Sequence, residues 1–211
     1  MRLALVGMSG SGKSFWSERL SGSGFCRFCC DDLIAARLAA ELGEGGGSIT
    51  AVGRWMGFPF EPHYREREAA YLACEVMVMT EILGELDNCR EDSEEKIVVD
   101  TTGSVIYTGE ATLQRLRRLT TIVHLETPLE VQQKKLEAYV QLPRPVLWRD
   151  LFVRRPEETD SQAMARCYPS LLASRESQYE RLAHVTINYH LHRRAGFSME
   201  EFLRDALSAR I

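Results

Sequence analysis

Gly7-Met8-Ser9-Gly10-Ser11-Gly12-Lys13-Ser14 fits the pattern G-x-x-x-x-G-K-[ST] of a phosphate-binding loop. The apolar run from Leu3 to Val6 precedes it and predicts a buried strand, while Lys13 to Leu20 predicts a helix. This placement between a strand and a helix is the context that the motif needs in order to bind phosphates. The segment therefore predicts a P-loop protein.

The residue types of the loop suit the triphosphate of a nucleotide. Its glycines let backbone N–H groups turn inward around phosphate oxygens. Lys13 would neutralise the β and γ oxygens, and the Ser14 hydroxyl would hold Mg²⁺. A plain turn that caps a helix needs neither residue, so we expect ATP and Mg²⁺ as cofactors. The residues predicted to bind ATP are Gly7, Ser9, Gly10, Ser11, Gly12, Lys13 and Ser14.

The composition indicates one globular domain over residues 1–211, with 45% hydrophobic and 27% charged residues. A formal net charge of −4 gives no global basic field, so neither nucleic acid nor an anionic membrane surface is expected as a partner. A small anionic molecule can still bind in a local basic cleft. The sequence does not predict the oligomeric state.

The N-terminal apolar run is too short for a signal peptide or a membrane span. The six cysteines lie at positions 26, 29, 30, 74, 89 and 167 and do not follow the cysteine spacing of a secreted, disulfide-rich scaffold. We therefore expect reduced thiols and a cytoplasmic location. Cys26-x-x-Cys29-Cys30 lacks a second Cys/His pair at ligand spacing, so ordinary thiols are expected there rather than a zinc site.

Strand and helix patterns alternate along the rest of the chain. Further strands are expected over 25–30, 96–99, 120–125 and 185–189. Helices are expected over 33–42, 49–56, 64–86, 110–116, 128–140, 168–182 and 198–209. Such βα units predict an α/β fold with three layers, α/β/α, around a parallel sheet whose strand ends bind the ligands. The aperiodic, arginine-rich stretch of about 141–166 is expected to be a mobile lid.

Four later segments contain acids and arginines. They are Cys29-Cys30-Asp31-Asp32-Leu33-Ile34, Tyr64-Arg65-Glu66-Arg67-Glu68, Arg144-Pro145-Val146-Leu147 and Arg175-Glu176-Ser177-Gln178-Tyr179-Glu180-Arg181-Leu182-Ala183. Together with the P-loop, they make the chain from about Leu3 to Asn188 resemble the shikimate kinase family, within the nucleoside-monophosphate-kinase-like group of P-loop folds. The resemblance implies a kinase that transfers the γ-phosphate of ATP to a hydroxyl of a small anionic metabolite.

The resemblance also implies a role for each segment. Asp31 takes the place of the carboxylate that grips substrate hydroxyls and helps to activate the attacking one, which suits carboxylate chemistry. Arg65 and Arg175 take the places of two arginines that bind the substrate carboxylate, with Glu68 holding Arg65. Arg144 takes the place of the lid arginine that reaches the transferring phosphates. The implied catalytic residues are Lys13, Asp31 and Arg144.

Each of these roles has a plainer structural alternative. Asp31 and Asp32 would favour a helix N-terminus in any protein. Arg65, Arg175 or their neighbours could lie on a solvated helix face. Lys135 falls near the position of the family's adenine-side basic residue, as does Lys134, but lysines on a helix are commonly exposed.

The chain departs from the family pattern at the acceptor site. Three consecutive glycines normally end the third strand, whereas this chain has Thr102-Gly103-Ser104, so only Gly103 can lie against the substrate as bare backbone. Cys29 stands where the family has an acid near the Mg²⁺ shell. Asp100 could coordinate Mg²⁺ through water, together with Ser14, or could simply cap a turn. The acceptor therefore stays open between shikimate and a different polyol, sugar acid or nucleoside, and a nucleotide-binding module or slow ATPase without an acceptor is the alternative class.

Overall fold

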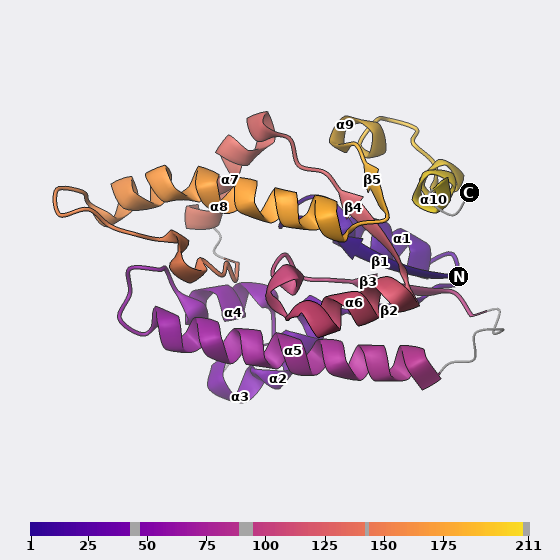
Figure 1. Ribbon diagram of the computed structural model, residues 1–211, viewed down its shortest axis with the longest axis horizontal. Helices are drawn as coiled ribbons and strands as arrows, with labels where there is room; N and C mark the ends of the chain where they lie inside the picture. Colours follow the sequence, from indigo (N-terminus) through magenta and orange to yellow (C-terminus); the bar gives the residue numbers. More distant parts are fainter. Residues whose placement is uncertain (43–46, 89–94, 142–143, 209–211) are drawn as a thin grey trace.

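The computed structural model describes residues 1–42, 47–88, 95–141 and 144–208 (Figure 1). Within these residues the chain forms a five-stranded sheet in the order β2-β3-β1-β4-β5, with all neighbours parallel. The strands are β1 (Arg2–Val6), β2 (Cys26–Cys29), β3 (Ile97–Asp100), β4 (Thr121–Leu125) and β5 (Val185–Ile187). This sheet confirms the predicted α/β class.

Helices follow the strands and cover both faces of the sheet. They are α1 (Lys13–Ser21), α2 (Cys30–Arg37), α3 (Ala39–Leu42), α4 (Ile49–Met56), α5 (Tyr64–Asn88), α6 (Glu110–Leu119), α7 (Leu129–Gln141), α8 (Asp160–Leu182), α9 (Tyr189–His192) and α10 (Met199–Leu207). Two short 3₁₀ helices are η1 (Val105–Tyr107) and η2 (Arg149–Leu151). Across the described ranges, no helix has the length and apolar character that crossing a membrane requires.

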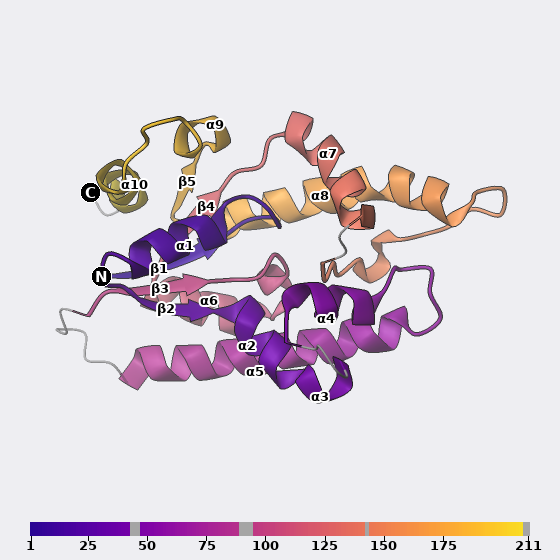
Figure 2. The same cartoon turned by 180° about the vertical axis from the view of Figure 1, so that it is seen from behind.

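Side chains that alternate along β1 divide the core into two layers. Leu3 and Leu5 pack with Trp16 of α1 and with residues of α10, whereas Ala4 and Val6 pack with residues of α2, α5, α6 and α8. The reverse view shows α2, α3 and α4 alongside α5, across the sheet from α10 (Figure 2). The two-residue period of a strand sends neighbouring side chains to opposite faces, and both faces are covered, so the strand is apolar throughout.

The register of the sheet aligns the carboxyl ends of its central strands. Leu5 pairs with Asp100, Asp100 pairs with Cys29, and Val6 pairs with His124. The P-loop, the start of α2 and the segment after β3 therefore leave the sheet at the same edge. Ligands bind at this edge in parallel α/β sheets, so the topology gathers three of the segments that the sequence singled out.

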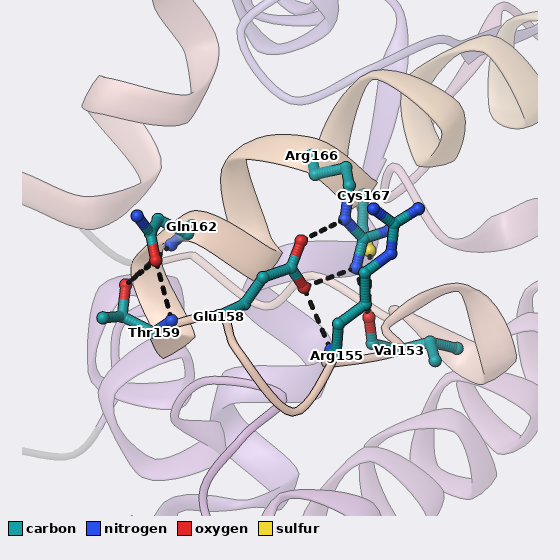
Figure 3. Close-up of polar contacts among 7 residues, drawn as sticks. All are labelled: Val153, Arg155, Glu158, Thr159, Gln162, Arg166 and Cys167. Atoms are coloured by element: carbon teal, nitrogen blue, oxygen red, sulfur yellow. Dashed lines mark hydrogen bonds and ion pairs between the residues drawn. The ribbon is translucent and has the colours of Figure 1, made fainter.

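The segment expected to be an irregular lid is shorter than predicted. α8 begins at Asp160 instead of 168, because Thr159 and Gln162 form a capping box. Gln162 N donates to Thr159 Oγ1 at 3.3 Å, and Thr159 N donates to Gln162 Oε1 at 2.9 Å (Figure 3). The helix then continues through Pro169. The expectation that regular structure is missing as far as residue 166 is therefore wrong at its C-terminal end.

Arg166 fastens the turn that precedes α8. Its Nε and Nη2 donate to the two carboxylate oxygens of Glu158 at 2.5 and 2.7 Å, and Arg155 N donates to the same carboxylate at 3.0 Å (Figure 3). The hydrogen bonds from Arg166, followed by the one from the Arg155 backbone, lower the pKa of Glu158 to about 2. Part of the arginine-rich stretch thus closes a local turn and does not reach the sheet edge.

The chain after Arg144 is docked on α5. Trp148 is fully buried, and its backbone N–H donates to the Tyr64 hydroxyl at 2.9 Å. Arg149 N donates to Glu68 Oε1 at 2.9 Å, and the Tyr64 hydroxyl lies 2.8 Å from the same oxygen. These bonds hold the backbone of the lid segment against the helix, next to the strand ends.

The described cysteines form no disulfide. The free thiols are Cys26, Cys29, Cys30, Cys74 and Cys167. Cys89 lies outside the described residues. Burial raises the pKa of Cys29 to about 12 and also raises that of Cys30, so both remain protonated thiols. Among the residues that the structure describes, no three His, Cys, Asp or Glu side chains are grouped to hold a metal ion.

Candidate active site

The P-loop connects β1 to α1 through backbone conformations that only glycine adopts easily. Gly7, Gly10 and Gly12 have φ values of 140°, 73° and 110°. A Cβ atom on Gly7 would lie 2.7 Å from the carbonyl oxygen of Leu125. The spacing of glycines in the motif is thus required by the shape of the loop as well as by access to phosphates.

Lys13 is the buried cation of the loop. Its Nζ donates to Gly7 O at 2.8 Å and to Met8 O at 3.0 Å, and the residue is 8% exposed. Burial lowers the pKa of Lys13, and the carboxylates of Asp100 and Asp31 oppose that shift. An ammonium group held by carbonyl oxygens can exchange them for the oxygens of a phosphate, which form stronger, charge-assisted hydrogen bonds.

A cavity of about 520 Å³ adjoins the loop. The predicted site residues that line it are Ser9, Gly10, Gly12, Lys13, Ser14, Asp31, Gly103, Arg144 and Arg175. They come from the P-loop, α1, α2, the segment after β3, the lid segment and α8. The structure therefore gathers most of the predicted site around one space, with the phosphate-binding loop at one side.

Asp31 lies in the first turn of α2 and is half-buried at the cavity. Burial raises the pKa of Asp31 from 3.8 to about 6, and the nearby Lys13 ammonium opposes the shift. Above that pH the side chain is a carboxylate that can accept a hydrogen bond and then a proton from a hydroxyl. The structure thus places Asp31 at the cavity, and its role as a base stays a prediction.

Arg175 of α8 is a buried guanidinium group, 5% exposed. Its Nη2 donates to Leu147 O at 2.7 Å, and its Nε is buried without a hydrogen-bond partner among the described residues. The guanidinium carbon lies 5.5 Å from the centre of the Tyr107 ring. Among described side chains, no carboxylate lies within ion-pair distance of Arg175, although the buried Glu75 interacts with it electrostatically, so the cavity contains a guanidinium group without a direct ion-pair partner.

Gly103 lies between the P-loop and Arg175. A Cβ atom there would be 3.5 Å from Ser9 N and 3.8 Å from Arg175 Nη1. The Tyr179 hydroxyl donates to the carbonyl oxygen of Gly103 and fixes the turn. Bare backbone is thus retained at the one position where the family pattern survives.

The structure does not bring Arg65 to the cavity. Tyr64 and Glu68 occupy the inward face of α5, one turn apart, so Arg65 projects from the exposed face. Glu68 binds the Tyr64 hydroxyl and Arg149 N instead of holding Arg65. The implied two-arginine clamp therefore reduces to Arg175, with Arg144 exposed at the cavity rim.

Asp100 is buried at the end of β3, behind the P-loop. Its Oδ2 accepts hydrogen bonds from Ser17 Oγ at 2.9 Å and Arg27 Nη2 at 3.0 Å. Oδ2 is thus hydrogen-bonded to Arg27, and Asp100 does not line the cavity, so the structure does not place Asp100 as a Mg²⁺ ligand there. Ser14 does line it, so Ser14 fits a Mg²⁺ ligand, since Mg²⁺ in such sites takes few protein ligands and several phosphate or water oxygens.

Two cations beside the P-loop were not assigned to the phosphates from the sequence. Lys135 of α7 donates from Nζ to Ser9 O, and burial lowers the pKa of Lys135 to about 8. Arg193, just after α9, donates from Nη2 to Gly10 O at 2.7 Å. Both line the cavity. Arg193 and Arg194 follow the last strand of the sequence. This pair of arginines is the sequence feature from which the role of Arg193 could have been predicted.

A second cavity of about 620 Å³ shares Gly12, Phe15 and Arg193 with the first. His192 is buried at its wall, where Nδ1 accepts from Trp16 Nε1 at 3.3 Å. Burial lowers the pKa of His192 to about 4, so the ring is neutral with its proton on Nε2. Nε2 is buried and has no hydrogen-bond partner among the described residues.

Solved structures share this arrangement. The shikimate kinase from Acinetobacter baumannii in complex with shikimate matches with a TM-score of 0.62 and 20% identity, over 100% of this chain and 94% of that one. The shikimate kinase from Aquifex aeolicus matches with a TM-score of 0.51 and 19% identity, over 90% of this chain and 86% of that one. The shikimate kinase from Bacteroides thetaiotaomicron matches with a TM-score of 0.52 and 16% identity, over 97% of this chain and 95% of that one. The chain therefore has a shikimate kinase-like P-loop fold.

These likenesses establish the fold and leave the activity to the site. No protein-family model matches the chain. No curated protein matches it either. At identities of 16–20% the fold can be the same while the site serves another function.

Replacement of Arg27 by methionine tests the Asp100 network. Arg27→Met leaves a carboxylate that is 3% exposed without its cation, so we expect the free energy of unfolding to fall by about 2–4 kcal/mol in urea denaturation. Arg37→Met is the matched control, because the partner of Arg37, Glu81, is well exposed, and it should cost less than about 1 kcal/mol. Equal losses in the two variants would show that the buried pair has no special role.

Proposed function

We propose that this protein is a small-molecule kinase that transfers the γ-phosphoryl group of ATP to a hydroxyl of an anionic metabolite. Arg175 carries the proposal: its guanidinium is buried and lacks an ion-pair partner in the described part of the chain, and it lines the same cavity as Lys13 and Asp31. A buried charge left unpaired reduces stability. A site that binds an anion at this position would explain why the charge is retained.

The acceptor is proposed at the level of its chemical class. The Acinetobacter baumannii enzyme is a shikimate kinase in complex with shikimate, which is a small hydroxylated anion. The shared fold and the gathered cations support an acceptor of this kind. Thr102 and Ser104, which add side chains where that family has bare glycines, are the reason for not narrowing the acceptor to shikimate. A cytoplasmic location and a single domain with a lid are part of the same proposal.

In the proposed reaction the phosphates of ATP lie on the backbone N–H groups of the P-loop. Lys13 exchanges its carbonyl partners for β and γ oxygens, while Lys135 and Arg193 stand at the rim of the loop. Ser14 would hold Mg²⁺, which would further neutralise the charge of the phosphates. The triphosphate is thus fixed with its γ-phosphorus directed into the cavity.

The acceptor enters from the opposite side with its anionic group on Arg175. Asp31 accepts the proton of the attacking hydroxyl as the new bond from that oxygen to the γ-phosphorus forms. The bond between the γ-phosphorus and the bridging oxygen of ADP breaks, and its electron pair leaves with ADP. Arg144 can approach the transferring group from the lid segment, where it would stabilise the charge spread over the equatorial oxygens.

The function is tested by ADP release over a panel of hydroxylated metabolites. We expect one or more hydroxy acids to stimulate ADP release by the wild type. Lys13→Ala should abolish that stimulation and weaken ATP binding, because the buried phosphate-binding cation is gone. Lys96→Ala, at an exposed position away from the loop, is the control. ATP binding without stimulation by any panel member would favour a nucleotide-binding module or slow ATPase.

Asp31→Asn tests the base. We expect turnover to fall by roughly 10²–10⁴-fold while ATP affinity measured by calorimetry stays within about threefold. Asp32→Asn, at the exposed neighbour in the same helical turn, should keep turnover. Because the pKa of Asp31 is raised to about 6, protonation removes the base as pH falls through 6, and kcat/KM should drop about tenfold per pH unit below it. A flat profile from pH 5 to 8 would exclude this assignment.

Arg175→Met tests the anion site. Loss of a charge-assisted contact should raise the KM of an anionic acceptor by about 10–100-fold and leave that of a neutral polyol unchanged. Arg149→Met is the matched control, because Arg149 also lies near the Tyr107 ring but is exposed and absent from the cavity wall. An unchanged KM for the anionic acceptor in Arg175→Met would remove the basis of the proposal.

A further inference from the structure

Glu75 of α5 is a fully buried carboxyl group one side chain behind the cavity wall. Its Oε2 accepts from Ser104 Oγ at 2.6 Å, and its Oε1 accepts from Thr102 Oγ1. No described arginine, lysine or histidine forms an ion pair with it. Thr102 lines the cavity, as does Tyr71, which lies one turn before Glu75. Thr102 and Ser104, which stand where the family pattern has glycines, are therefore both hydrogen-bonded to the buried Glu75.

While Glu75 is a carboxylate, these bonds direct both hydroxyl protons toward it, and the two hydroxyl oxygens lie 3.0 Å apart. The Thr102 hydroxyl donates to Glu75, and its oxygen accepts the backbone N–H of Ser104 at 3.0 Å. The Ser104 hydroxyl donates to the other carboxylate oxygen. A hydroxyl has one proton and two lone pairs, so while Glu75 is a carboxylate Thr102 Oγ1 has no proton left for the cavity. Tyr71, which lines the cavity and also hydrogen-bonds to Thr102, is a second partner for its remaining lone pair. Toward a ligand, Thr102 can act only as a hydrogen-bond acceptor.

Several groups from the surrounding elements set the charge of Glu75. Burial raises the pKa of Glu75 to about 7, the bonds from Ser104 and Thr102 oppose that shift, Asp31 of α2 adds to it, and Arg175 of α8 opposes it. The other titratable groups that interact with Glu75 are Tyr71 and Cys74 of its own helix, Cys30 of α2 and Tyr179 of α8. The carboxylate form accepts both hydroxyl protons; the protonated form must place its own proton on one partner and turn that hydroxyl around.

We propose that Glu75 is a positioning residue that makes Thr102 an obligate hydrogen-bond acceptor at the cavity wall, and so selects a metabolite with a second donor group, a hydroxyl or an amine, beside the hydroxyl that is phosphorylated. The inference rests on the proposed function, whose acceptor it describes more closely. It also explains the departure from the three-glycine pattern, because the added side chains of Thr102 and Ser104 would discriminate between acceptors. A buried polar group left unpaired by a poor ligand discriminates strongly, because its hydrogen bond to water is lost and not replaced.

The test compares two sets of probes. Shikimate, quinate and glycerate carry more than one hydroxyl, whereas glycolate and 3-hydroxybutyrate carry one. For the wild type we expect kcat/KM to favour the first set by at least about tenfold, the value of one good hydrogen bond. Thr102→Val, which keeps the shape and removes the oxygen, should abolish the preference through KM, and Thr102→Ser should restore it. Thr108→Val, at a buried threonine bonded to Val105 O outside the cavity, should leave it unchanged.

Glu75→Gln separates positioning from packing. An amide supplies only one acceptor oxygen, so one of the two hydroxyls must reverse, and the preference should fall in KM while kcat stays within about threefold. The ratio of KM values between the two probe sets should change between pH 6 and 8 in the wild type and be flat in Glu75→Gln. The effect of Asp31 cancels in that ratio. Glu85→Gln, on the exposed face of the same helix, should behave like the wild type.

The outcomes distinguish this inference from the kinase proposal. Acceptor-dependent turnover with the same preference in wild type and Thr102→Val would overturn the role of Thr102 and Glu75 while leaving the kinase standing. A preference lost in Thr102→Val but unaltered in Glu75→Gln at every pH would overturn the positioning role of Glu75. ATP binding without turnover of any probe by the wild type would overturn both proposals together.

Discussion

Parallel pairing of β1 with β3 on one side and β4 on the other is the constraint on which the site depends. Leu5 pairs with Asp100, and Asp100 pairs with Cys29 of β2, so the carboxyl ends of these three strands lie at one level of the sheet. The P-loop, the first turn of α2 and the turn after β3 then face a common space. A shift of one residue in this register would turn the alternating core residues of β1 to the wrong faces, so the packing of the core and the geometry of the site are fixed together.

The second organising feature is a group of cations that are hydrogen-bonded to carbonyl oxygens and not to carboxylates. Lys13 is bonded to carbonyl oxygens, as are Lys135 and Arg193, and the Arg175 guanidinium is bonded to Leu147 O. Asp100, which is buried at the end of β3, is paired with Arg27. In the proposed function these cations serve two kinds of anion, a triphosphate on the P-loop and an acceptor near α8. The overall charge of −4 conceals this local field completely.

The sequence predicted those parts that depend on local spacing. The P-loop, the alternation of strands and helices, and Asp31 at the start of α2 follow from motifs within a few residues. The orientation of α5 could not be read in this way, because Tyr64 and Glu68, which bind the lid backbone, decide which face turns inward, and Arg65 is thereby exposed. The role of Glu75 depends on partners 27 and 29 residues away, which no local pattern connects. The start of α8 had a local signal in Thr159 and Gln162, but the arginines and prolines around it obscured that capping box.

The central claim is that one cavity brings the γ-phosphate of ATP and a hydroxyl of an anionic acceptor together. A crystal structure of the protein with a non-hydrolysable ATP analogue, Mg²⁺ and an acceptor from the ADP-release panel measures this directly. We expect the phosphates on the P-loop with Lys13, the acceptor anion on Arg175, and its hydroxyl oxygen about 3–3.5 Å from the γ-phosphorus and within reach of Asp31. An acceptor bound with its anion away from Arg175 and its hydroxyl out of reach of Asp31 would contradict the account.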